Sequence, residues 1–417
     1  MNPFSYQDRQ LCAENVRLAE VAKQVGTPCY VYSRAFIEDR FRAFDAALAG
    51  RDHLICYAVK ANSNLAVLNL LARLGSGFDI VSGGELARVL AAGGEARKVL
   101  FSGVGKSERE VAQALQAGIR CLNLESEEEM RRVAQVAATL GRRAPVAFRV
   151  NPDVDAGTHP YISTGLRKNK FGVPYEDAPR LYALAAKDPS LEVVGIGCHI
   201  GSLMMGAGPF VDAARRIRDL VERLERAGLR MSHVDLGGGF GIRYRDESPA
   251  AIREFLDGAQ SAFAGRTEAL IVDPGRAVVG NAGLLLTRVE YVKTGKEKNF
   301  LVVDAAMNDL LRPSLYDAWH DVRPVHERND KAAAAVYDVV GPVCESADFL
   351  AKDSGLAARA GDLLAIMSAG AYGMVMSSNY NSRPRAAEVL VDGSRIHVVR
   401  RRETVEQLYA GESIPSW

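Results

Sequence analysis

The sequence lacks the features of a membrane-spanning or secreted protein. No apolar stretch in its 417 residues approaches the roughly 20 residues that a membrane-spanning helix needs. Its first residues, MNPFSYQDRQLCAENV, are polar and include acids, so they do not have the charged-then-apolar layout of a secretion signal. We therefore expect a cytoplasmic protein that makes no use of a membrane.

The sequence also lacks a charge excess and a cysteine framework. Lys and Arg together number 52 and Asp and Glu 51, so nothing indicates the basic face that nucleic-acid binding usually requires. The six cysteines are scattered, and no CxxC pair occurs among them. This spacing argues against a disulfide scaffold or a zinc site and favours a reducing compartment. We expect no metal and no nucleic-acid partner.

Eight short apolar runs, each ending in small or polar residues, follow one another through the first two thirds of the chain. Between them lie segments such as EREVAQALQAG, whose apolar residues have helical spacing. Such alternation favours a parallel sheet with crossover helices, and eight units match a closed (β/α)₈ barrel. An open doubly wound sheet is the alternative, but no GxGxxG directly follows the first strand. The runs are LICYAVK (54–60), GFDIVSGGE (77–85), VLFSGV (99–104), CLNLES (121–126), VAFRVN (146–151), VVGIGCHIGS (193–202), HVDLGGGF (233–240) and LIVDPGR (270–276).

After residue 280 the pattern changes to strands, among them NFLVVDAAM, AVYDVVGPV and EVLVDGSRIHVV, in which DGS is a hairpin turn signal. We expect an α/β protein in which a TIM-like barrel at 30–280 is followed by a β-rich domain. Residues 1–29 and 281–417 form that second domain, which the strand CYVYS (29–33) would join. The Gly-, Lys- and Asn-rich stretch DVDAGTHPYISTGLRKNKFG, between strands five and six, predicts an active-site loop.

Working residues of a (β/α)₈ barrel cluster at the carboxyl ends of its strands. Lys60 ends an apolar strand there, where a lysine can lose its proton and form a Schiff base with a carbonyl. The alternative is a lysine that merely pairs with an acid. His199, at the end of strand six, either stacks on a flat cofactor or belongs to the core.

The string GGGFG follows strand seven, and its glycines would let backbone N–H groups approach a phosphate. Loops after strands seven and eight often form the phosphate site of such barrels, although a tight turn alone would also use glycine. Asp273 after strand eight would hold a proton on a pyridine nitrogen, or would cap a helix before Pro274.

Four further candidates lie in the β-rich domain. Arg312 and Tyr316 in LLRPSLY would suit a carboxylate, because a guanidinium binds one through two parallel hydrogen bonds. Cys344 and Glu345 in GPVCES place a thiol beside an acid. None of these patterns is specific alone, since most arginines coat surfaces.

Taken together and in order, the motifs resemble one family. YAVKAN, FDIVSGGE, HIGS, DLGGGFG, DPGR, LLRPSLY, GPVCES and AGAYG…SSNYNSRPR are similar to the diaminopimelate decarboxylases, of the alanine-racemase-like (fold type III) class of pyridoxal phosphate enzymes. The resemblance covers about residues 25–392. It implies a cofactor, pyridoxal 5'-phosphate, and the decarboxylation of meso-2,6-diaminopimelate to L-lysine, the last step of lysine biosynthesis. It also implies a homodimer with shared active sites.

The resemblance assigns roles to single residues. It implies that Lys60 binds the cofactor covalently, that His199 stacks on its ring and that Asp273 contacts its ring nitrogen. Cys344 would donate the proton that replaces carbon dioxide, and Glu345 would bind the distal amine, both reaching the site of the partner subunit. The remaining cofactor residues would be Asp79, Ser202, Gly238, Gly239, Gly275, Arg276 and Tyr372. The distal carboxylate of the substrate would meet Arg276, Arg312, Tyr316 and Tyr372.

Two departures from the family pattern stand out. The family usually has Glu where this chain has Asp273, which is one methylene shorter. After HIGS, family members usually carry Gln and polar residues, whereas this chain has the apolar, Gly-containing run Leu203–Gly208. Both changes put the substrate and full activity in question.

Other functions remain open at this point. They are decarboxylation of ornithine, lysine or arginine, a racemase, or a catalytically impaired homologue. Decarboxylases of those other amino acids tend to have an acid-Gly pair after the cysteine, where this chain has Glu345-Ser346. The presence of Lys60 and Cys344 argues against a silent homologue.

Overall fold

The computed structural model describes residues 2–155, 170–328 and 334–417. The chain forms two compact units, and each contains segments that are distant in sequence. We call them the barrel unit, formed by Arg40–Ile242 and Ser248–Ala277, and the β-rich unit, formed by Met1–Asp39, Arg243–Glu247 and Val278–Trp417.

The barrel unit contains eight parallel strands in a ring, which the pairing of β8 with β9 closes. The predicted (β/α)₈ barrel is therefore confirmed, and each of the eight predicted runs overlaps one strand of the ring. These runs are rich in branched and aromatic residues, which suit a strand buried on both faces. The strands are β5 (His53–Ala58), β6 (Gly77–Ile80), β7 (Val99–Phe101), β8 (Cys121–Leu124), β9 (Ala144–Asn151), β11 (Leu191–Gly197), β12 (His233–Asp235) and β13 (Ala269–Val272), and the short β10 (Val173–Pro174) pairs with β9.

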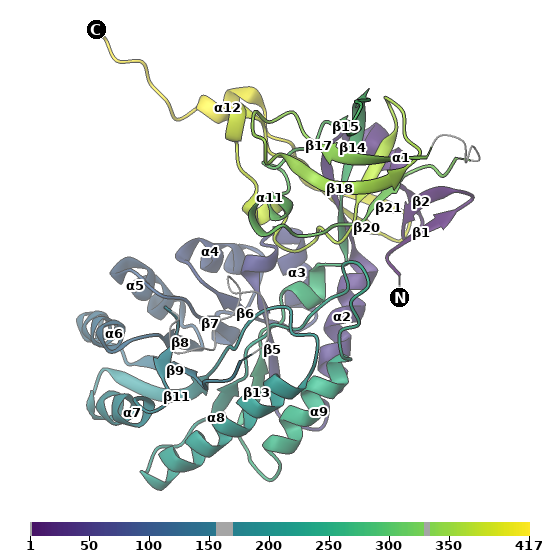
Figure 1. Ribbon diagram of the computed structural model, residues 1–417. Coiled ribbons are helices and arrows are strands. Elements are labelled where there is room, and N and C mark those ends of the chain that lie inside the picture. Colours follow the sequence, from purple (N-terminus) through teal and green to yellow (C-terminus); the bar gives the residue numbers. More distant parts are fainter. Residues whose placement is uncertain (1, 156–169, 329–333) are drawn as a thin grey trace. The chain divides into compact units, whose positions relative to one another are not determined.

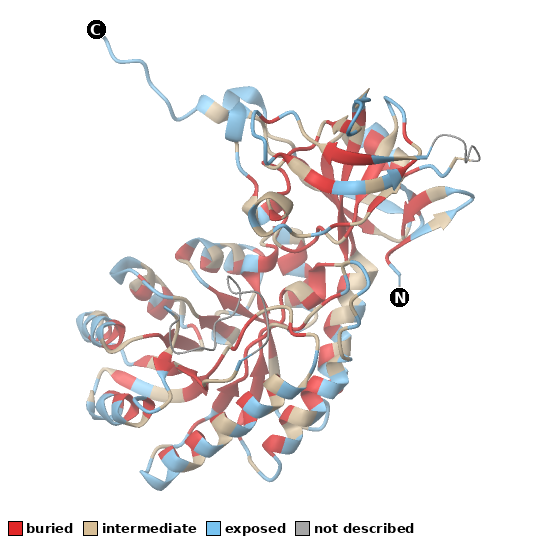
Figure 2. Cartoon of the chain, in the orientation of Figure 1, coloured by how far each residue is buried: buried red, intermediate tan, exposed pale blue. Residues whose placement is uncertain are grey.

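Helices α4 to α9 lie outside the ring (Figure 1), and each has one face buried and the opposite face exposed (Figure 2). Serine side chains cap α4, α5 and α6, and Ser107 forms a capping box with Glu110. The helices are α2 (Arg34–Ala47), α3 (Leu65–Arg73), α4 (Gly83–Ala91), α5 (Glu108–Ala117), α6 (Glu127–Thr139), α7 (Ala178–Lys187), α8 (Gly208–Arg226), α9 (Ile252–Ala262) and α10 (Arg276–Val279). The predicted active-site loop between β9 and β11 falls largely on 156–169, which lie outside the described residues.

The β-rich unit is built on a sheet with the strand order β18-β17-β15-β14-β4-β20-β21, and β19 joins β16 to β14. Its central strand β4 pairs antiparallel with β14 and parallel with β20, so the prediction that CYVYS joins this domain is confirmed. The predicted hairpin at DGS is also confirmed, with Gly393 at a φ of 61°. The strands are β4 (Cys29–Ser33), β14 (Gly283–Lys293), β15 (Phe300–Val303), β16 (Val322–Pro324), β17 (Ala335–Val340), β18 (Phe349–Leu356), β19 (Leu363–Ile366), β20 (Ala387–Asp392) and β21 (Arg395–Arg400).

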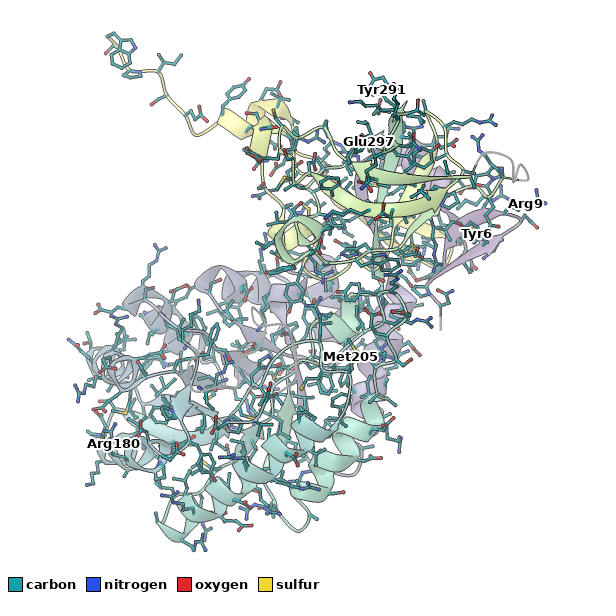
Figure 3. The ribbon with its side chains drawn as sticks, in the orientation of Figure 1. Tyr6, Arg9, Arg180, Met205, Tyr291 and Glu297 are labelled. Atoms are coloured by element: carbon teal, nitrogen blue, oxygen red, sulfur yellow. The ribbon has the colours of Figure 1, made fainter. Side chains whose placement is uncertain are left out.

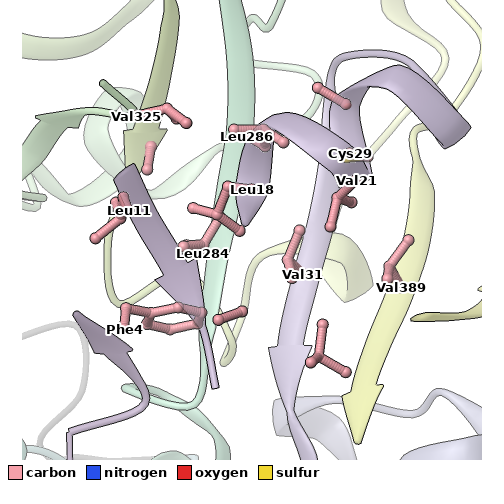
Figure 4. Packing of buried hydrophobic residues seen from close by; sticks show 14 of the residues in the cluster. Phe4, Leu11, Leu18, Val21, Cys29, Val31, Leu284, Leu286, Val325 and Val389 are labelled. Carbon is pink, nitrogen blue, oxygen red and sulfur yellow. The ribbon is translucent and has the colours of Figure 1, made fainter. Parts of the chain in front are cut away.

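A small N-terminal sheet packs on this larger one. It consists of β1 (Phe4–Gln7), β2 (Gln10–Ala13) and β3 (Val16–Arg17), and α1 (Leu18–Val25) follows it. Phe4, Leu11 and Leu18 share a buried cluster with residues of β4 and β14 (Figure 4). Tyr6, labelled in Figure 3, adds a hydrogen bond from its hydroxyl to the carbonyl of Pro324 at 2.6 Å. The N-terminal residues are therefore part of the core of the β-rich unit.

Two short helices, α11 (Arg312–Tyr316) and α12 (Val405–Tyr409), complete the β-rich unit. Across the described ranges, no helix is long and apolar enough to cross a membrane.

Candidate active site

Lys60 lies in a single turn of 3₁₀ helix, Val59–Ala61, directly after strand β5. Its two neighbours are buried, while Lys60 itself is exposed. Its charge acts on the groups around it. Burial is the largest influence on the pKa of Asp79 and Asp273 and raises both, whereas the charge of Lys60 lowers both. The amine therefore faces the acids at the carboxyl ends of the barrel strands.

Three aspartates from three strands form a buried group at this end of the barrel, and the charge of Lys60 acts on two of them, Asp79 and Asp273. The three are Asp79 on β6, Asp235 on β12 and Asp273 after β13. Burial raises the pKa of all three, that of Asp235 to about 7, and Asp79 and Asp235 raise the pKa of Asp273 further by repulsion. Buried carboxylates of like charge disfavour ionisation unless a cation joins them. The cluster therefore favours a ligand that brings a positive charge or a donated proton.

His199 is a neutral acceptor at this site. Burial lowers its pKa well below the ordinary value, and the charges of Arg149 and Lys60 lower it further. Its Nδ1 accepts a hydrogen bond from the N–H of Gly238 at 3.2 Å, so the ring carries its proton on Nε2. The Nδ1–Oδ1 separation from Asp273 is 3.7 Å. That contact is not an ion pair, because the imidazole is uncharged.

The glycine turn after β12 is packed too closely for any side chain. A Cβ at Gly238 would lie 2.3 Å from the backbone oxygen and from Oδ1 of Asp273. A Cβ at Gly239 would lie 2.0 Å from the carbonyl oxygen of Gly201, and Gly239 has a φ of 86°. The N–H of Met204 donates to the oxygen of Gly239 at 2.9 Å. The turn is thus held against the loop that follows β11, to which Ser202 and the labelled Met205 of Figure 3 belong.

The PGR turn after β13 lies against the turn that carries Lys60. A Cβ at Gly275 would lie 2.9 Å from the Cβ of Ala61, and the N–H of Ala58 donates to the oxygen of Pro274 at 3.2 Å. Arg276 follows as the first residue of α10. The carboxyl ends of β5 and β13 therefore meet, as the barrel predicts.

These groups fit a flat cofactor that carries an aldehyde, a phosphate and a basic ring nitrogen. Lys60 supplies an amine, the glycine turns allow close backbone approach, and a buried carboxylate would accept a hydrogen bond from a protonated ring nitrogen. Across the described residues, no cluster of three or more His, Cys, Asp or Glu side chains suits a metal ion.

The β-rich unit holds the other predicted residues. Arg312 is buried at the start of α11, and Tyr316 ends the same helix half-buried. Tyr372 is half-buried with a φ of 55°, which is rare for a residue with a side chain.

Cys344 and Glu345 lie exposed on the loop between β17 and β18. Asp348 stabilises this loop, because it accepts hydrogen bonds from the N–H groups of Met307 at 2.6 Å and Val343 at 2.8 Å. The N–H of Cys344 donates to Oδ1 of Asn381 at 3.0 Å. The thiol of Cys344 and the carboxylate of Glu345 are therefore exposed groups on a loop whose backbone is fixed by hydrogen bonds.

The motif SSNYNSRPR orients this loop from the other side. The hydroxyl of Tyr380 donates to Oε1 of Glu345, and Asn381 is the acceptor for Cys344. Hydrogen bonds thus connect the motifs GPVCES and SSNYNSRPR, which are distant in sequence.

The sequence-based interpretation missed two charged residues of the barrel cluster, Asp235 and Arg149. Arg149 has a side chain only 13% exposed, acts on the pKa of the three acids and of His199, and donates to the oxygen of His199 at 3.4 Å. The signal was present, because each is a charged residue within an apolar strand run, VAFRVN and HVDLGG. Such residues are costly to bury without partners.

Comparison with known proteins gives a consistent result. The family described as "Pyridoxal-dependent decarboxylase, pyridoxal binding domain" matches residues 34–280. The diaminopimelate decarboxylase of Pseudomonas aeruginosa is 59% identical over 414 residues, which is 99% of each chain, and that of Vibrio cholerae is 55% identical with the same coverage. The crystal structure of diaminopimelate decarboxylase from Helicobacter pylori, complexed with L-lysine, superposes with a TM-score of 0.92 at 42% identity, covering 95% of this chain and 99% of the other.

Proposed function

Because this chain belongs to the diaminopimelate decarboxylases, a family of pyridoxal-dependent decarboxylases, we propose that it converts meso-2,6-diaminopimelate to L-lysine and carbon dioxide. The observation that carries the proposal is the amine of Lys60, whose charge acts on the buried acids Asp79 and Asp273 and whose turn packs against Gly275. The relative from Helicobacter pylori binds L-lysine, the expected product. When bound, pyridoxal 5'-phosphate supplies an electron sink for the electron pair that remains when the carboxylate leaves.

The residues proposed to bind the cofactor have different tasks. The amine of Lys60 would hold the cofactor covalently, and the imidazole of His199 would support its ring. The carboxylate of Asp273 would accept a hydrogen bond from the protonated ring nitrogen and so keep the proton there. The negative charges of Asp79 and Asp235, which act on Asp273, would further favour a positively charged ring. Ser202, Gly238, Gly239, Gly275, Arg276 and Tyr372 are proposed around the phosphate.

Asp273 occupies the position where the family usually has Glu. The shorter side chain is fixed by the packing of Gly238, whose Cα lies close enough that a Cβ would reach 2.3 Å from Oδ1. The close packing of Gly238 therefore limits the movement of the Asp273 side chain.

Recognition of the substrate falls to its second carboxylate. Arg276, Arg312, Tyr316 and Tyr372 are proposed to bind this group, because a guanidinium binds carboxylate through two parallel hydrogen bonds. Ornithine, lysine and arginine have no such group. The set therefore favours diaminopimelate over those amino acids.

Cys344 is proposed to deliver a proton to the α-carbon, and Glu345 to pair with the distal ammonium of the substrate. Both side chains are exposed, and we propose that they serve the active site of a second subunit in a homodimer. Mixing Lys60→Ala protein with Cys344→Ala protein tests this directly. Hybrid dimers would contain one intact site, so about a quarter of the wild-type activity should return. Without shared sites, the mixture stays inactive.

The substrate is tested by measuring carbon dioxide release from meso-diaminopimelate, L-lysine, L-ornithine and L-arginine. We expect release from diaminopimelate alone. Release of carbon dioxide from ornithine but not from diaminopimelate would contradict the proposed substrate. Borohydride reduction followed by peptide mapping should find the cofactor attached at Lys60, and attachment elsewhere would overturn the site.

We also propose a cytoplasmic location. The proposed proton donor Cys344 must remain a free thiol although it is exposed, and reducing compartments maintain such thiols. Fusion of the chain to a fluorescent protein, followed by microscopy and fractionation, would test this.

A further inference from the structure

Arg312 is a buried guanidinium, and two aromatic side chains surround it within the β-rich unit. Its Nη1 lies 2.8 Å from Nε2 of His320, and its guanidinium carbon lies 4.7 Å from the centre of the Tyr244 ring. Only 4% of Arg312 and 1% of His320 are exposed. A buried guanidinium is costly unless its N–H groups have partners, so these contacts are structurally significant.

The hydrogen bonds of His320 determine its tautomer. Its Nδ1 lies 2.8 Å from the carbonyl oxygen of Met367, which only accepts hydrogen bonds, so Nδ1 carries the proton. Its Nε2 then has a lone pair and accepts from Nη1 of Arg312. His320 is therefore an uncharged acceptor that is fixed at both nitrogens.

Tyr244 covers the face of the guanidinium. Its ring also meets the ring of His320 edge-on, at 5.5 Å between centres and 84° between planes. The hydrogen bond to His320 restrains Arg312 along its plane, and the Tyr244 ring restrains it across that plane. Together the two contacts define the orientation of the guanidinium.

Tyr244 is itself well anchored. Its N–H donates to Oε2 of Glu247 at 2.9 Å, and the side chain of Asn281 donates to the oxygen of Arg243 at 2.9 Å. The segment Arg243–Glu247 follows the glycine turn along the chain but belongs by its contacts to the β-rich unit. The chain thus leaves the barrel unit at this point and returns to it, carrying Tyr244 to Arg312.

We propose that His320 and Tyr244 are positioning residues that orient Arg312 and so set the preference for a substrate with a second carboxylate. This inference rests on the proposed role of Arg312. Two parallel N–H groups must lie in the plane of the carboxylate for bidentate binding, and a tilted guanidinium loses one of them. Neither residue touches the reacting atoms in this scheme, so the effect appears in substrate binding.

The experiment compares steady-state kinetics of the holoenzyme variants with meso-diaminopimelate. His320→Leu, which removes the acceptor, should raise KM by about 10-fold to 100-fold with kcat changed less than about 3-fold. His320→Gln restores an acceptor and a donor and should recover most of that loss. An unchanged KM in His320→Leu, or a fall confined to kcat, overturns the proposal.

Tyr244 gives an independent arm. Tyr244→Leu should raise KM by about 3-fold to 30-fold, because the ring face is lost, and Tyr244→Phe should lie closer to wild type. Tyr291→Leu is the matched control, since Tyr291 is 68% exposed and lies far along strand β14 of the same unit. An equal effect of Tyr291→Leu and Tyr244→Leu contradicts a specific role for Tyr244.

A double-mutant cycle separates positioning from general stability. In an Arg312→Leu background, His320→Leu should raise KM by less than about 2-fold, because the group that it positions is gone. A full additional increase would show that His320 acts through something other than Arg312. If His320→Leu does not fold, the Tyr244 variants in both backgrounds decide by the same criterion. Absence of carbon dioxide release by the wild type would defeat the proposed function, whereas normal release with unaffected KM values in the variants would defeat this inference alone.

Discussion

In the barrel unit the acids beside Lys60 are buried and their pKa values are raised, whereas in the β-rich unit Cys344 and Glu345 lie exposed on a braced loop. The barrel cluster consists of residues at the carboxyl ends of three strands of the barrel unit itself. The loop of Cys344 is held in place by backbone and side-chain hydrogen bonds, yet its reactive groups face solvent. A proton donor that faces solvent would exchange its proton with water. Cys344 could therefore protonate a substrate efficiently only when another surface covers its loop.

The strongest test of the barrel side is Lys60→Ala. Removing the amine should lower turnover by more than about 10⁴-fold, because covalent attachment and proton transfer at this position are both lost. Absorbance of the bound cofactor and carbon dioxide release measure the two effects. Retention of a borohydride-reducible cofactor by this variant would contradict the role of Lys60.

The corresponding test of the β-rich side is Cys344→Ala. Turnover should fall by about 10²-fold to 10⁴-fold, the usual contribution of a positioned proton donor. Because the thiol is exposed, cofactor content and the unfolding temperature should stay at wild-type values. Normal turnover of this variant would show that Cys344 is not the proton donor. The β-rich unit would then have no exposed catalytic group to compare with the buried cluster of the barrel unit.

Gly238→Ala probes how tightly the barrel side is packed. The added methyl group would approach the backbone oxygen and Oδ1 of Asp273 to 2.3 Å, so the turn must shift. We expect cofactor affinity about 10-fold to 100-fold weaker and a stability loss of about 1–3 kcal/mol. Gly206→Ala is the matched control, as no atom lies within 4 Å of the added Cβ. Similar losses in both variants would argue against specific packing at Gly238.

Asp235→Asn should have the smallest effect, on the pH dependence of stability without cofactor. Burial raises the pKa of Asp235 from 3.8 to about 7, so the folded state keeps a proton that the unfolded state releases. Stability of the wild type therefore falls as pH rises from about 4 through about 7. Asparagine does not titrate, and at pH 8 the variant should melt about 2 °C or more above the wild type.

Thermal unfolding between pH 5 and pH 8 measures this slope. Asp257→Asn, an exposed change on α9, should leave it unaltered. An Asp235→Asn variant with the wild-type slope would show that Asp235 does not carry the buried charge.

The barrel could be predicted from sequence because each strand is a continuous apolar run between helices of clear periodicity. Strand β18 could not, since its residues FLAKDSGL include exposed polar positions and a left-handed Asp353 at a φ of 51°. Its structure comes from irregular pairing with β17, which no local pattern reveals. The strands β1 to β3 were missed for a similar reason, because they are short and are stabilised by packing on residues more than 250 positions away.

The site divides in the same way. Lys60, the glycine turn and Asp273 follow strands directly, so the barrel geometry predicts where they lie. His320 and Tyr244 have no local signal, because their importance depends on a guanidinium that only the fold brings to them. The pairing of Glu345 with Tyr380 is also a product of tertiary structure.

Strand β4 has a consequence for how the chain is made. It occupies Cys29–Ser33, all five residues are buried, and its two neighbours are β14 and β20. During synthesis on the ribosome it must wait for both partners, the second of which begins at Ala387, while the barrel residues 40–277 emerge in between. Until then the edges of β4 remain unpaired, and unpaired apolar strands are prone to aggregate. Nascent chains that end before β20 should therefore depend on chaperones far more than the complete enzyme does.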